Sequence, residues 1–97
     1  MDMANWLRVI EKRGGMNNVV QFIFDSGKFE IIEPDKPWED QVSWDTEDDA
    51  WIFYKPHDPF TINNNVSRRY HVESNHNLQS IVFVEKESDK RYYRADV

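Results

Sequence analysis

Apolar residues near the N-terminus recur at the spacing of a helix. They occupy positions i, i+3, i+4 and i+7, with charged residues between them: Met3, Trp6, Leu7 and Ile10. This spacing places all of them on one helical face, and Gly14 and Gly15 supply a stop signal directly afterwards. The pattern predicts one amphipathic helix from Asp2 to Arg13.

Beyond the helix, apolar and polar residues alternate, and the composition favours sheet. Val and Ile total 16 whereas Leu and Ala total 5, and β-branched side chains suit a pleated surface. Over residues 19–33 the alternation predicts a hairpin that turns at Ser26 and Gly27. A two-residue loop there would pair Phe22 with Ile31, so that both face the core.

Further segments have the composition of strands, and turn-forming residues separate them. A loop is predicted over Pro56–Ser67, which contains a run of asparagines, and a turn over Ser74–Asn77. The predicted fold class is therefore α+β, a single domain over residues 1–97 with one N-terminal helix packed on an antiparallel β-sheet of about five or six strands. The further strands are expected at Ala50–Lys55, Arg68–Glu73, Leu78–Glu87 and Arg91–Ala95.

The charge of the chain is concentrated in residues 33–49, called the acidic segment below. It holds 8 acidic residues and 1 lysine, a net charge of 1 − 8 = −7, whereas the rest of the chain holds 10 acids and 11 bases. Pro34 and Pro37 argue against a strand at its beginning, where Asp35 could cap a helical turn that starts at Pro37. Because this charge repels nucleic acid and anionic membranes, the natural partner is a cationic protein surface.

The sequence therefore predicts a non-catalytic protein-binding or inhibitor module of the DNA-mimic type. Its acidic surface would occupy a basic, nucleic-acid-binding site of a partner protein. Duplex DNA carries one charge per ~1.7 Å of axis, so a mimic needs carboxylates at high density. A purely structural alternative is that tryptophans anchor this segment to the core while carboxylates keep its outer side hydrated. The residues predicted to contact the partner are Glu39, Asp40, Trp44, Asp45, Glu47, Asp48 and Asp49.

Catalytic and metal sites have little support in the sequence. A metal-dependent hydrolase could be drawn from His57, His71 and His76, but these lack the i, i+4 spacing of a zinc-binding helix. The alternating acids that end the acidic segment lack the glycine and the closing glutamate of a calcium loop. There is no cysteine and no G-x-S-x-G motif. We predict no catalytic residue, no cofactor and no metal.

A further alternative is a nucleic-acid-binding module that uses the C-terminal strand. The run Arg91–Arg94 interleaves basic and aromatic residues, as in proteins that stack bases on a sheet. If the last hairpin has a three-residue loop, however, Glu87 would face Arg91, and the bases would pair with neighbouring acids. With the acidic segment present, direct nucleic-acid binding is not expected.

The location of the protein is predicted to be cytoplasmic. No apolar run exceeds five residues, far short of the ~20 that a membrane-spanning helix needs. The N-terminal residues lack the apolar stretch of a signal peptide, and the absence of cysteine fits a reducing compartment. No membrane contact is predicted, and an exposed sheet edge could pair two copies as a homodimer.

Overall fold

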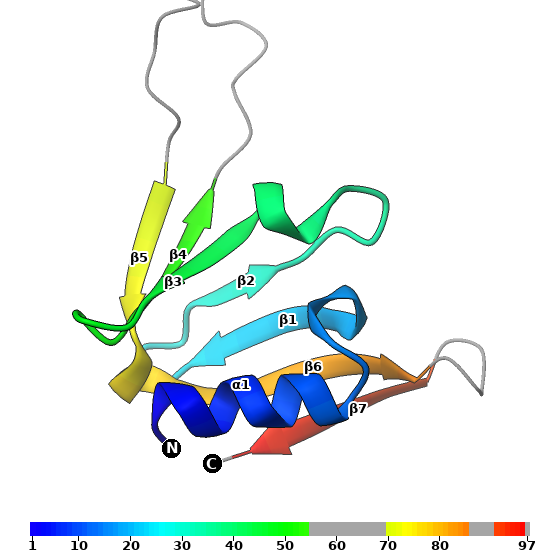
Figure 1. Cartoon of the computed structure of the whole chain (residues 1–97), viewed down its shortest axis with the longest axis horizontal. Helices are drawn as coiled ribbons and strands as arrows, with labels where there is room; N and C mark the ends of the chain where they lie inside the picture. The colour runs from blue at the N-terminus through cyan, green and yellow to red at the C-terminus, as the bar shows by residue number, and fades with distance from the viewer. Residues whose placement is uncertain (55–69, 86–90, 97) are drawn as a thin grey trace, which may run out of the picture.

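The computed structural model describes residues 1–54, 70–85 and 91–96, which are arranged as Figure 1 shows. The chain begins with helix α1 (Met3–Lys12), preceded by Asp2, whose side chain accepts a hydrogen bond from the backbone N–H of Asn5 at 2.8 Å. This cap satisfies one of the donors that a helix leaves unpaired in its first turn. The predicted helix is confirmed, and the two residues predicted as its ends, Asp2 and Arg13, are its caps.

The described residues form seven strands, all paired antiparallel and divided between two sheets. One sheet has four strands in the order β2-β1-β6-β7, and the other has three in the order β3-β4-β5. The α+β class is thus confirmed, whereas the single sheet of about five or six strands is wrong. The strands are β1 (Val19–Phe24), β2 (Phe29–Ile31), β3 (Val42–Asp45), β4 (Ala50–Tyr54), β5 (Tyr70–Ser74), β6 (Leu78–Glu85) and β7 (Arg91–Asp96).

After β2, the chain leaves the four-stranded sheet and enters the three-stranded one. Pro34 and Pro37 follow β2, and neither offers a backbone N–H to a strand ladder, so the chain turns away from the first sheet. A short 3-10 helix, η2 (Trp38–Asp40), then leads into β3. The helical turn is confirmed, but no side chain caps it, so the predicted cap at Asp35 is wrong. β3 lies within the acidic segment, where the sequence predicts no strand.

The hairpin of β1 and β2 is present, but its register differs by one residue from the prediction. Phe22 pairs with Glu30 and not with Ile31, because the loop holds three residues and ends at Gly27. Gly27 has a φ of +83°, which glycine adopts at little cost and which three-residue hairpin loops require. Phe29 and Ile31 are consequently 55% and 60% exposed, and they leave the inner face of β2 to Glu30.

The two sheets and α1 enclose one hydrophobic core. Phe22 of β1 contacts Trp51 and Phe53 of β4, with ring centroids 5.0 Å and 5.2 Å apart. Trp6 and Ile10 of α1 belong to the same cluster of buried side chains, and Figure 1 shows α1 across β6 and β7, away from the three-stranded sheet. Aromatic side chains dominate this core, and each one removes a large apolar area from water.

The remaining elements agree with the predicted ones except at their ends. The turn predicted after β5 is a 3-10 helix, η3 (Asn75–Asn77), in which the backbone N–H of His76 donates to Oγ of Ser74 at 3.2 Å. In the last hairpin Arg91 pairs with Glu85, so the predicted pairing of Arg91 with Glu87 is wrong. The predicted loop at Pro56–Ser67 lies outside the described residues.

Among the residues that the structure describes, no helix is both long enough and apolar enough to cross a membrane.

Candidate functional site

The acidic segment is divided by β3 into two groups of carboxylates. Four acids precede β3 in its connection from β2, and four lie in the last residue of β3 and the turn to β4, at its opposite end (Figure 1). A strand rises ~3.3 Å per residue, so β3 is roughly 10 Å long and the two groups lie at least about that far apart. The first acidic group consists of Glu33, Asp35, Glu39 and Asp40, and the second of Asp45, Glu47, Asp48 and Asp49.

One side chain, Gln41, holds the connection that carries the first acidic group. Its Oε1 accepts from the backbone N–H of Glu33 at 2.7 Å. Its Nε2 donates to the carbonyl oxygens of Glu33, Lys36 and Pro37 at 3.0, 3.2 and 3.3 Å. These bonds pair backbone groups that lie outside any strand ladder. The shape of the connection is therefore fixed within the fold.

The turn that carries the second acidic group is shaped by Asp45. Its Oδ1 accepts from the backbone N–H groups of Glu47 and Asp48 at 2.9 and 3.2 Å, so a side chain takes the place of a backbone acceptor. Asp49 has a φ of +51°, a region that aspartate enters more readily than most residues. Its carbonyl oxygen accepts from the N–H of Asn75 at 2.8 Å, which ties the turn to the residue that follows β5.

Several carboxylates of the acidic segment face water without a basic partner in the described part of the chain. Glu33 pairs with Lys36 at 2.9 Å, and Asp49 lies 3.9 Å from the ring of His76. Glu39, Glu47 and Asp48 are exposed, and none of the described residues forms an ion pair with them. The negative potential of these side chains therefore extends into the solvent.

Trp44, the aromatic residue predicted to contact a partner, is half-buried in β3. Its ring meets that of the fully buried Trp51 edge to face, with centroids 5.9 Å apart. The ring of Trp38 lies nearly parallel to that of Trp44, with centroids 6.1 Å apart and an angle of 12° between the rings. The two outer rings border a groove of about 220 Å³, called the tryptophan groove below. Its lining residues are Trp38, Glu39, Val42, Ser43 and Trp44.

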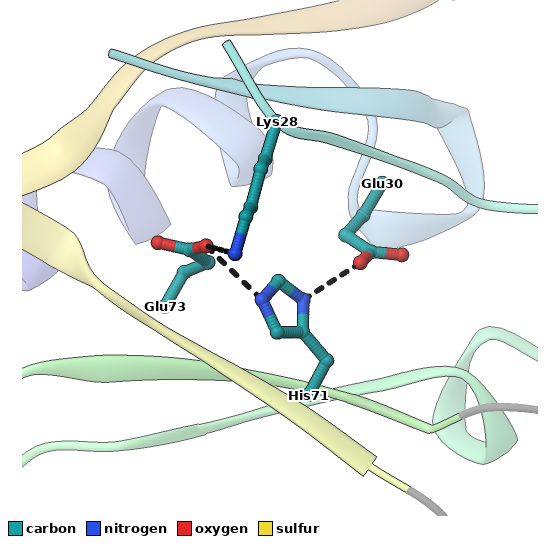
Figure 2. A network of polar contacts seen from close by, with 4 residues as sticks. All are labelled: Lys28, Glu30, His71 and Glu73. Carbon is teal, nitrogen blue, oxygen red and sulfur yellow. Dashed lines mark hydrogen bonds and ion pairs between the residues drawn. The ribbon is translucent and has the colours of Figure 1, made fainter. Parts of the chain in front are cut away.

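A different polar cluster lies between the edge strands β2 and β5 of the two sheets (Figure 2). The Nδ1 of His71 is 2.8 Å from Oε1 of Glu30, and its Nε2 is 3.0 Å from Oε1 of Glu73. The two glutamate side chains are only 11% and 10% exposed. The largely exposed Lys28 reaches to 3.9 Å from Glu73. These four residues are called the His71 cluster below.

The geometry of the His71 cluster connects the two sheets. Ionised carboxylates only accept hydrogen bonds, so the donor in these contacts is a ring N–H of His71. The bond from His71 to Glu30 joins β5 to β2. The two ring nitrogens lie on opposite sides of the ring and address different carboxylates (Figure 2), so the three side chains do not converge on one point as ligands of a metal ion must.

The structure gives the histidines of the hydrolase alternative separate surroundings. His71 is held between two carboxylates, whereas the His76 side chain is 86% exposed and lies near Asp49. His57 lies outside the described residues. Within residues 1–54, 70–85 and 91–96, no group of three or more histidines or acids is placed to hold a metal ion.

The basic and aromatic run of the second alternative forms part of β7. Arg94 donates from Nη2 to Oγ of Ser80 at 2.7 Å, and its Nε lies 3.7 Å from Oδ1 of Asp96. This guanidinium is therefore engaged within its own sheet. The upstream Arg68 and Arg69 lie outside the described residues.

The sequence contained part of the signal for the His71 cluster. His71 and Glu73 are two residues apart in a predicted strand, a spacing that places them on the same face. Glu30 was missed because the predicted register of its hairpin placed it on the opposite face. The role of Gln41 could not be predicted from the sequence. Its hydrogen-bond partners are backbone atoms of residues 33–37, and every residue has such atoms, so no side-chain pattern indicates the contact.

Known proteins offer no template for assigning a role to these residues. Protein-family models, curated proteins and solved structures were each compared with the chain, and none of them matches it.

Proposed function

We propose that this chain is a non-catalytic protein-binding module whose acidic segment occupies a basic, nucleic-acid-binding surface of a partner protein. The observation that carries the proposal is the outward position of Glu39, Glu47 and Asp48, which form no ion pair with any described residue. Carboxylates that remain hydrated in the fold are available to replace phosphates at a basic surface.

The spacing of the two acidic groups supports imitation of a duplex. Duplex phosphates form two lines separated by grooves about 6 and 12 Å wide. β3 is roughly 10 Å long and lies between the two acidic groups, so their separation is at least of the same order. A basic surface shaped for two phosphate lines would therefore meet negative charge at both ends of β3.

The local scaffolding of both groups supports binding as well. Gln41 fixes the connection before β3, and Asp45 fixes the turn after it. Loops held in one shape before association lose less conformational entropy when a partner docks. The concentrated charge would in addition accelerate encounter with a basic surface, an effect that salt weakens.

The test compares two triple variants that remove the same charge. The first, Glu39→Gln with Glu47→Gln and Asp48→Asn, neutralises exposed carboxylates of the acidic segment. The control neutralises exposed carboxylates elsewhere: Glu11→Gln, Asp25→Asn and Asp96→Asn. The partner is captured on the immobilised chain from a host lysate, eluted with salt and identified by mass spectrometry. Association rates are then measured with the purified partner over a range of salt concentrations.

The acidic-segment variant should associate roughly tenfold more slowly at low salt and lose most of its salt dependence. The control variant should retain both properties, and duplex DNA should compete with the unmodified chain for the partner. Equal losses in the two variants would mean that net charge alone matters. That result, or a failure of DNA to compete, would refute the proposal.

A further inference from the structure

We propose that the tryptophan groove binds an arginine side chain of the basic partner. This inference depends on the proposed function, because it names the group that the acidic segment would receive from that partner. It concerns Trp38, Trp44 and Glu39, which meet in the groove at the junction of η2 and β3.

The aromatic part of the groove is anchored to the core. Trp44 leans edge to face on Trp51, which is 0% exposed and donates from Nε1 to Oδ1 of the buried Asn75 at 2.8 Å. Trp38 stands nearly parallel to Trp44, at a ring angle of 12°. Both outer rings are half-buried and line the groove of about 220 Å³. The rings are thus positioned before any ligand arrives.

The charge around the groove selects a cation as its occupant. Glu39 lines the groove and is exposed, and none of the described basic residues pairs with it. The surrounding acidic segment carries a net charge of −7. The electron-rich face of an indole attracts a cation, and a carboxylate beside it adds a directed hydrogen-bond acceptor. An apolar side chain could fill the groove but would not neutralise the charge of Glu39.

Among protein cations, guanidinium fits this combination better than ammonium. It is planar and can stack on an indole face, and it is more weakly hydrated, so it loses less on leaving water. Its forked N–H groups can also bind a carboxylate such as Glu39 through two hydrogen bonds. Lysine offers a strongly hydrated point charge with neither advantage.

The experiment titrates the ¹⁵N-labelled chain with capped hexa-arginine and with capped hexa-lysine, which carry equal charge. The indole N–H resonances of Trp38 and Trp44 report on the groove, and that of the buried Trp6 serves as an internal control. The variants are Trp38→Leu, which keeps an apolar cover over Trp44, and Glu39→Gln. Glu47→Gln is the matched control, since it removes the same charge at the opposite end of β3.

We expect hexa-arginine to bind roughly fivefold more tightly than hexa-lysine, with shifts at the indoles of Trp38 and Trp44. Trp38→Leu should abolish the preference, and Glu39→Gln should weaken hexa-arginine binding more than Glu47→Gln does. If Trp38→Leu is poorly folded, the comparison of the exposed Glu39 and Glu47 variants still decides. If Trp38 only shielded Trp44 from water, the unmodified chain would bind hexa-arginine and hexa-lysine equally well.

Equal affinity for the two peptides, or equal effects of Glu39→Gln and Glu47→Gln, would overturn the arginine site. If the partner's association still depended on the acidic segment, the proposed function would survive that result. If the triple variant of the acidic segment left partner binding unchanged, the proposed function itself would fail, whatever the peptides show.

Discussion

The His71 cluster and the acidic segment use carboxylates in opposite ways. In the His71 cluster, Glu30 and Glu73 are withdrawn from water and each meets a nitrogen of His71. In the acidic segment, Glu47 and Asp48 stay in water and meet no described base. A carboxylate taken out of water destabilises the fold by several kcal/mol unless it is hydrogen-bonded or paired. The fold therefore supplies a partner in the first region, while solvent fulfils that role in the second.

This difference separates charges that hold the fold together from charges that are available to another molecule. Neutralising a side chain of the His71 cluster should change the free energy of unfolding and leave the outer surface nearly as it was. Neutralising an exposed side chain of the acidic segment should do the reverse. The substitutions below test this division, in order of decreasing expected effect.

The largest effect is expected from His71→Ala. It removes the ring that lies within hydrogen-bond distance of the mostly buried Glu30 and Glu73, and a lost hydrogen bond to a charged group costs about 1.5–3 kcal/mol. Because the two carboxylates relax toward water, we expect a net loss of about 2–3 kcal/mol in the free energy of unfolding, measured by urea denaturation at pH 7.

His76→Ala is the matched control for this substitution. The His76 side chain is 86% exposed, so its removal should change the free energy of unfolding by less than about 0.5 kcal/mol. Adding Glu30→Gln to His71→Ala should recover part of the loss, because it removes one of the two mostly buried negative charges that the ring of His71 no longer contacts. Similar small effects of the two histidine variants would show that the His71 cluster does not stabilise the fold.

The next effect concerns the turn that positions Glu30. Gly27→Ala places a side chain at a φ of +83°, where no other atoms lie close enough to clash. The cost is therefore backbone strain alone, and we expect a loss of about 1–2 kcal/mol in the free energy of unfolding. Ser26→Ala in the same loop should change it by less than about 0.5 kcal/mol. An equal loss in both would argue against a special role for Gly27.

Gly27 also shows where prediction from sequence succeeds and where it stops. Helix α1 was predictable because its signals, an apolar face and the cap at Asp2, are local. The sequence was sufficient to predict a hairpin but not its register. Phe29 and Ile31 are as apolar as core residues, so the sequence favoured the register that buries them, whereas the structure pairs Phe22 with Glu30. Loop conformation decided between the two registers, and the sequence does not state whether Gly27 ends a loop of two residues or three.

The candidate sites were only partly predictable for a related reason. The outward carboxylates of the acidic segment could be predicted from composition. β3 was missed because its four residues lie among acids and prolines, and its hydrogen-bonding partner is β4, a separate segment of the chain. The expected single acidic patch consequently became two groups. The bond between Glu30 and His71 spans 41 positions, and it exists only once the second sheet has brought β5 beside β2.

Asp45 belongs to the acidic segment by charge but also shapes its turn, so its charge and its hydrogen bonds can be separated. Asp45→Ala removes the acceptor for the N–H groups of Glu47 and Asp48 and should reduce the free energy of unfolding by about 1 kcal/mol. Asp45→Asn keeps an acceptor oxygen and removes only the charge, so it should retain most of that stability. If both variants lost the same amount in urea denaturation, the negative charge would be the stabilising element instead.

The smallest effect is expected from the double variant Glu47→Gln with Asp48→Asn. Both side chains are exposed and have no described basic partner, so the free energy of unfolding should change by at most about 0.5 kcal/mol. Any change should be a gain, because the variant relieves repulsion among the carboxylates of the second acidic group. The gain should disappear in 1 M NaCl, where the Debye length falls to about 3 Å and the repulsion is screened. Urea denaturation at low and high salt measures both quantities. A clear loss of stability in this variant would mean that these carboxylates form stabilising contacts within the fold, like those of the His71 cluster, and are not free to bind a partner.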